Sequence, residues 1–149
     1  MRLIISVVLI LIASTSTFSQ EKKDTILNAN QNTNAEPIND TTTYEVVDSV
    51  AYFPGGLPAW NKYIVKNLNA TVGVDNGAKA GTYNVIIKFT VTKDGTLKNF
   101  VPVTKYKHGF EEELTRILKL SPKWIPAKRN GVVVNSRLEQ NQYWQITNK

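Results

Sequence analysis

Few residues in this sequence have the types and spacing that catalysis requires. The chain has 149 residues, one histidine and no cysteine, which excludes a cysteine nucleophile, a thiolate metal site, a disulfide and a lipid-modified cysteine. His108 lies in a Tyr-Lys-His-Gly turn, with no second ligand or base at motif spacing. Asp94 could act as a base, but it belongs to a Lys-Asp-Gly sequence typical of a turn. We therefore expect no enzyme activity, no cofactor and no metal site.

Basic and aromatic residues could instead form a binding surface. The 18 Lys and Arg exceed the 12 Asp and Glu, but no block of five or more like charges occurs. The aromatic side chains could stack nucleic-acid bases or sugars, yet most of them are expected in the core. The acidic triplet 111–113 falls in the first turn of an expected helix, where carboxylates complement the helix dipole. We expect neither a nucleic-acid partner nor a small-molecule substrate.

Two helices are expected on the basis of hydrophobic spacing. The first places Leu57, Trp60, Ile64 and Leu68 on one face, and residues 69–81 after it are expected to form a loop. The second covers about residues 109–120 and ends at Ser121-Pro122. It should bury Phe110, Leu114, Ile117 and Leu118, and turn Glu111, Glu112, Arg116 and Lys119 to water.

Three strands complete the expected fold. Residues 83–91 alternate with period two, and a turn at 93–95 leads to a partner strand over 96–104 with Leu97, Val101 and Val103 facing the core. A third strand begins after the Asn130-Gly131 turn and runs from Val132 toward Ile146. Residues 139–142 interrupt its apolar pattern, which leaves a bulge or a shortened strand open. The fold class is therefore α+β, of order α-β-β-α-β.

The chain divides into three segments. Residues 1–19 begin Met-Arg and continue with an eleven-residue apolar run, Leu3 to Ala13, that is typical of a signal peptide; an uncleaved N-terminal anchor is the alternative. Residues 20–43 are rich in Asn and Thr and contain no aromatic residue, so we expect a disordered tether. Residues 44–149 form the folded domain, which is long enough to bury a core.

Four sequence motifs of this domain occur in an order that is similar to a known family. They are Phe53-Pro54-Gly55-Gly56 before the first helix, the hairpin Val91 to Leu97, the helix exit Leu120-Ser121-Pro122-Lys123-Trp124-Ile125-Pro126-Ala127, and the return Asn130-Gly131-Val132-Val133-Val134. Together they resemble the TonB C-terminal domain. The Pro-Lys-Trp-x-Pro element after an amphipathic helix is the most specific of the four.

The resemblance implies a three-stranded antiparallel sheet with two helices packed on one face. It also implies a periplasmic domain that binds the TonB box of TonB-dependent outer-membrane receptors, in transmembrane transport driven from the inner membrane. A further partner would be an anchored TonB/ExbB/ExbD-type complex. The family's energy transducers have a long Pro-rich spacer, whereas only Pro37 lies in the tether. The alternative function is a secreted cell-envelope module that binds glycan or protein without a transport role.

The last strand lies at a sheet edge in that fold, so its free N–H and C=O groups could accept an extended peptide by β-augmentation. The candidate partner-binding residues are Val132, Val134, Ser136, Arg137, Leu138 and Gln140. Val132, Val134 and Leu138 could instead be core residues. Arg137, Glu139 and Gln142 are expected to be exposed.

Export with cleavage can be tested directly. The small residues Thr17 and Ser19 stand where a signal peptidase reads its substrate, so the mature protein should begin at or near Gln20. Intact-mass measurement of the protein from the cell envelope checks this. Full-length chain in washed inner membranes would instead establish the uncleaved anchor.

Overall fold

The computed structural model of the protein describes residues 41–147 and shows an α+β domain, as the sequence predicts. The expected signal peptide and residues 20–40 of the expected tether lie outside the described residues. Within residues 41–147, no helix is long and apolar enough to cross a membrane. The elements in chain order are β1 (Thr43–Tyr44), α1 (Gly56–Asn67), α2 (Val72–Asp75), β2 (Gly81–Val91), β3 (Leu97–Pro102), α3 (Phe110–Leu120), β4 (Ala127–Arg129) and β5 (Val132–Ile146).

The sheet has five strands and is mixed, so the prediction of three antiparallel strands is wrong. β2 lies between β3 and β5 and is antiparallel to both, while β1 pairs with β5 in parallel and β4 pairs with β5 in antiparallel orientation. The expected α-β-β-α-β order omits β1, α2 and β4. These elements have two to four residues each, which is too short for a hydrophobic period to reveal them.

The expected core face of β3 is only partly correct: Leu97 is half-buried and packs against the core as predicted, whereas Val101 and Val103 do not. Val101 and Val103 are 57% and 48% exposed, although they were expected to face the core. The register with β2 shifts here, because Lys88 is opposite Val101 whereas Thr90 is opposite Lys98. This extra residue is a β-bulge, and Asn99 within it has a φ of 54°. Phe100 consequently takes the core side and stacks on Phe89, with ring centroids 6.1 Å apart.

β5 runs without interruption. Its pairing with β2 is continuous from Ser136, opposite Val91, to Ile146, opposite Gly81. The polar run at 139–142 therefore produces neither a bulge nor a shortened strand. The residues of β5 that pair with the buried Val85, Ile87 and Phe89 of β2 turn their side chains to the same face of the sheet.

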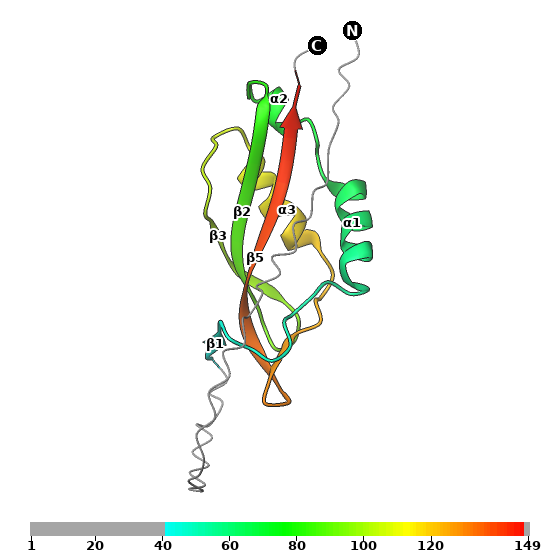
Figure 1. The fold of residues 1–149 in the computed structure, drawn as a ribbon, viewed down its shortest axis with the longest axis vertical. Coiled ribbons are helices and arrows are strands. Elements are labelled where there is room, and N and C mark those ends of the chain that lie inside the picture. The colour runs from blue at the N-terminus through cyan, green and yellow to red at the C-terminus, as the bar shows by residue number, and fades with distance from the viewer. Residues whose placement is uncertain (1–40, 148–149) are drawn as a thin grey trace, which may run out of the picture.

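Both predicted helices form at the expected positions, but the exposure of Glu111 and of Leu57 differs from the prediction. Phe110, Leu114, Ile117 and Leu118 of α3 are buried as expected, and Ser121 ends the helix in an extended conformation. Glu111 is buried rather than exposed, because its carboxylate accepts a hydrogen bond from the N–H of Tyr106 at 2.9 Å. In α1, Trp60 and Ile64 are buried but Leu57 is 48% exposed. Figure 1 shows α3 behind β2 and β5. It shows α1 next to β5, at the edge of the sheet that lies away from β3.

Trp124 lies at the centre of an aromatic cluster. Its ring is 5.5 Å from Trp60 of α1, 5.5 Å from Phe89 of β2 and 6.0 Å from Phe53, between ring centroids. The indole N–H donates to Ser121 Oγ at 3.0 Å, so the polar atom of this buried side chain is satisfied. Trp124 therefore joins α1, the sheet and the exit from α3.

Replacing this residue should be costly. Trp124→Ala removes the contacts with all three rings and leaves a cavity, which should lower the free energy of unfolding by about 3 to 5 kcal/mol. His108→Ala is the comparison, because that partly exposed ring makes one polar contact, with Asn76 O at 3.0 Å. Urea denaturation of both variants checks the prediction. Equal, small losses would contradict the central position of Trp124.

Candidate functional site

Asp94 and His108, the two residues considered for catalysis, both contact neighbouring side chains in the fold. Asp94 accepts hydrogen bonds from the hydroxyls of Thr92 and Thr96 and pairs with Lys123 at 3.3 Å. The Thr92 and Thr96 hydrogen bonds, followed by Lys123, hold the pKa of Asp94 well below its usual range, which suits a turn residue rather than a base. The ring of His108 packs beside Tyr83 and Phe110. Within residues 41–147, no three His, Cys, Asp or Glu side chains gather as metal ligands do.

The backbone groups of β5 face alternately toward β2 and away from it. Ile86 O of β2 accepts a hydrogen bond from the N–H of Val103 at 2.8 Å, so the polar groups of Ile86 face β3 and those of Ile87 face β5. Ile87 is opposite Gln140 in an unbroken register. Even-numbered residues of β5 from 136 onward therefore bond to β2. The odd-numbered residues turn their N–H and C=O groups to the other side, which we call the outer edge: Arg137, Glu139, Asn141, Tyr143 and Gln145.

Most of the outer edge has no strand beside it in the described part of the chain. β1 pairs only with Asn135 and Ser136, and the path of strands ends there. Just beyond it, Arg137 forms an exposed ion pair with Glu45 at 3.2 Å. The segment from 137 to 145 therefore presents the alternating donors and acceptors that a further strand requires.

Two glutamine side chains partly satisfy this edge. Gln140 Nε2 donates to Asn141 O at 2.9 Å, and Gln142 Nε2 donates to Tyr143 O at 3.1 Å. Both amides thus reach outward-facing carbonyl groups, which agrees with the orientation derived from β2. A partner strand would replace these contacts with main-chain hydrogen bonds, so part of the hydrogen bonding gained on binding is exchange rather than net gain.

The structure distributes the six predicted site residues over different environments. Val132 and Val134 pair with β4, on either side of Val133, and Val134 is buried. Ser136, which is 2% exposed, and the half-buried Leu138 and Gln140 turn their backbone groups toward β2. Arg137 is exposed and is the one member of the six that contributes backbone groups to the outer edge.

The other exposure predictions divide. Glu139 is exposed as expected and belongs to the outer edge, whereas Gln142 is 5% exposed because its side chain lies on the core side of β5. Sequence reasoning missed Asn141, Tyr143 and Gln145. The period of two of a strand, counted from Arg137, could have indicated these residues. Whether the odd- or the even-numbered residues face outward, however, depends on the register with β2.

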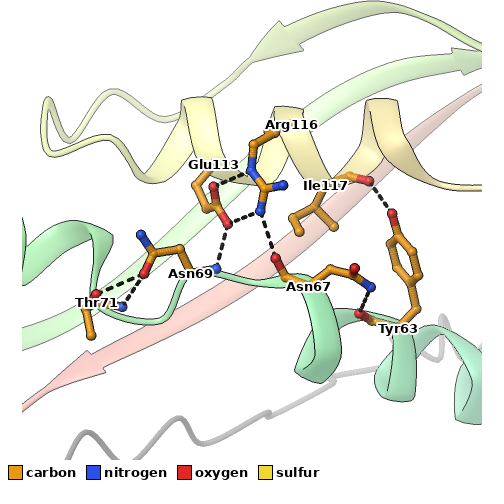
Figure 2. A network of polar contacts seen from close by, with 7 residues as sticks. All are labelled: Tyr63, Asn67, Asn69, Thr71, Glu113, Arg116 and Ile117. Atoms are coloured by element: carbon orange, nitrogen blue, oxygen red, sulfur yellow. Dashed lines mark hydrogen bonds and ion pairs between the residues drawn. The ribbon is translucent and has the colours of Figure 1, made fainter.

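A polar network joins α1 to α3 (Figure 2). It thereby holds α1 in its position beside β5 (Figure 1). Arg116 of α3 donates to both carboxylate oxygens of Glu113, and to Asn67 O at the end of α1 at 2.7 Å. Glu113 also accepts from the N–H of Asn69 at 2.6 Å. The hydroxyl of Tyr63 donates to Ile117 O at 3.1 Å. The bonds to Asn67 and Asn69 satisfy backbone groups where α1 ends, and the bond from Tyr63 satisfies a carbonyl in the last turn of α3.

Glu113 is the titratable group on which this network depends. Burial raises the pKa of Glu113, but the hydrogen bonds from Arg116 and Asn69 and the charge of Arg116 together outweigh it, so the pKa is lowered. Its side chain is 7% exposed, against 45% for Arg116. A carboxyl group whose pKa is lower in the folded state adds stability above its unfolded pKa and loses it as the pH falls.

Glu113→Gln should therefore change both stability and its pH dependence. The amide oxygen can still accept from Asn69, but the ion pair with Arg116 is lost, at a cost of about 1 kcal/mol at neutral pH. Unfolding free energies measured between pH 7 and acid should fall less steeply for the variant, below about pH 4.5, than for the wild type. Glu112→Gln, on the exposed side of the same turn, is the control. Parallel curves for all three proteins would refute the role given to Glu113.

A scan against models of known protein families finds none that matches this chain, and a search of curated proteins finds no significant match. The resemblance to the TonB C-terminal domain therefore rests on the four sequence motifs.

Proposed function

We propose that this protein is a periplasmic TonB-like interaction domain that binds TonB-box segments of outer-membrane receptors by adding them as a strand to the outer edge of β5. In this proposal the domain binds a peptide and catalyses no reaction. It acts in TonB-dependent transport as a partner of receptors, or of an anchored transducer complex.

The observation that carries the proposal is the row of backbone groups on the outer edge. Five residues, from Arg137 to Gln145, turn N–H and C=O groups away from β2, and β1 covers only the positions before them. An extended segment can satisfy such groups along its whole length, because adjacent strands lie about 4.8 Å apart with matching hydrogen-bond spacing. A folded partner without an exposed strand could not do so.

The arrangement of the longer elements also supports the proposal. We infer that α1, β2, β3, α3 and β5 correspond to the two helices and three antiparallel strands of the family, with β1, α2 and β4 added in this chain. The four motifs then have structural reasons. Gly95 of the hairpin, for instance, has a φ of 82°, and a Cβ there would lie 2.3 Å from Trp124 O, so the hairpin and the helix exit require a residue without a side chain at this contact.

The direction of each backbone N–H in β5 determines which substitutions test the proposal. Glu139→Pro removes an outward N–H that β2 does not use, and proline is tolerated in edge strands when its nitrogen faces away from the sheet. The affinity for a synthetic TonB-box peptide should fall at least about tenfold, or about 1.4 kcal/mol, while Glu139→Ala should have a smaller effect. Asn141→Pro, with Asn141→Ala beside it, repeats the comparison further along. Isothermal titration gives the affinities, and circular dichroism checks folding first.

Two controls complete this experiment. Leu138→Pro removes an inward N–H, so it should destabilise the sheet instead of acting on binding alone. Arg137→Ala should weaken binding slightly and in a salt-dependent way, because an exposed charge mainly steers the encounter. If the wild type binds no TonB-box peptide but captures a glycan or another envelope protein, the alternative cell-envelope module replaces this proposal.

A further inference from the structure

A cavity lies between α1 and β5, next to the outer edge. Its volume is about 230 Å³, and it opens at the surface between the first turn of α1 and the middle of β5. Leu57 and Trp60 line it from α1, Phe89 and Trp124 from the aromatic cluster, and Leu138 and Gln140 from β5. Leu57 leaves nearly half of its surface exposed there.

The position of the cavity relative to the outer edge determines what could enter it. Side chains of Leu138 and Gln140 project from β5 toward the cavity, whereas Glu139 between them turns its backbone outward. In neighbouring strands, side chains of paired residues project from the same face of the sheet. A strand added at Glu139 would therefore place the side chains of residues opposite Leu138 or Gln140 over this cavity.

The lining determines the chemistry. Its walls are the apolar and aromatic side chains, and the polar groups of Glu139 and Gln140 lie on the β5 side. A charged side chain buried against Trp60 and Trp124 would lose its hydration, and Glu139, the acidic residue of the lining, already pairs with Lys88 at 3.8 Å. An apolar side chain instead gains from leaving water. The volume is below the roughly 300 to 1,000 Å³ of pockets that hold whole small molecules. It fits a single side chain better.

We propose that this cavity is a specificity pocket for one bulky apolar side chain, such as Leu, Ile, Met or Phe, of an extended peptide bound at the outer edge. The inference rests on strand addition at β5, the geometry of the proposed function, but not on the identity of the partner. Main-chain hydrogen bonds at Glu139 hold the peptide, and the pocket reads one of its alternate residues. Leu57 forms the accessible wall of the pocket.

Selection of peptides tests this without assuming a partner. A displayed library of random heptapeptides is selected on the purified protein and on two variants, Leu57→Ser and Val65→Ser. Val65 is the matched control, because it is an apolar residue of the same helix, 74% exposed, and does not line the cavity. Wild type and Val65→Ser should enrich peptides with a bulky apolar residue at one fixed position, and Leu57→Ser should lose that preference.

A synthetic peptide from the selection then gives the magnitude. Replacing its fixed apolar residue with Ala should weaken binding to the wild type at least about tenfold, but binding to Leu57→Ser by a much smaller factor. Glu139→Pro should weaken both peptides, which locates them at the outer edge. Titration calorimetry measures each combination, and the coupling between Leu57 and the peptide residue is read from the double-mutant cycle.

The outcomes separate the pocket from the proposed function. Peptides that depend on Glu139 but show no apolar preference, or one that persists in Leu57→Ser, overturn the pocket and leave strand addition standing. Peptides that show the preference but do not resemble a TonB box support the pocket and count against the proposed partner. Failure to enrich any peptide on the wild type overturns the pocket and strand addition together.

Discussion

The packing of Trp124 is the interaction on which the arrangement of the domain depends. Its indole contacts the rings of Phe53, Trp60 and Phe89, which come from the segment before α1, from α1 itself and from β2. Its backbone N–H donates to Gly95 O at 2.9 Å. The backbone beside it bonds to Tyr52 through Ile125 in both directions. One short segment thus holds the hairpin, α1 and the chain that precedes it, so these parts cannot shift independently.

That convergence brings together sequence motifs that lie far apart along the chain. Phe53 before α1, Gly95 in the hairpin and Trp124 after α3 are in mutual or successive contact, although each motif by itself is a common turn or helix boundary. The wall of aromatic rings that results also forms the inner surface of the cavity beside β5. The residues that stabilise the domain are in this way the same residues that shape its candidate specificity pocket.

The sequence predicted the elements with strong periodicity and missed what depends on long-range register. Regular apolar spacing predicted β2 and α3. Their apolar residues are buried in the structure: Val85, Ile87 and Phe89 in β2, and Phe110, Leu114 and Ile117 in α3. The bulge at Asn99 is a single inserted residue, and its effect on the core side of β3 appears only when the strand is aligned with β2. The burial of Glu111 likewise depends on the N–H of Tyr106, in a loop whose path local propensity does not specify.

The candidate site shows the same division between local and long-range information. Exposed Arg137 and Glu139 could be recognised from residue type, but the choice of odd over even positions follows from the pairing of Ile86 with Val103, two strands away. This parity separates two properties of β5. Odd residues give their backbone groups to the outer edge and turn their side chains to the face of the sheet opposite to Leu138 and Gln140. Leu138 and Gln140 give their backbone groups to β2 and their side chains to the cavity. In strand addition at this edge, affinity would therefore come mainly from main-chain groups of odd residues, and selectivity from side chains of even residues and α1. Each could change by substitution with little effect on the other.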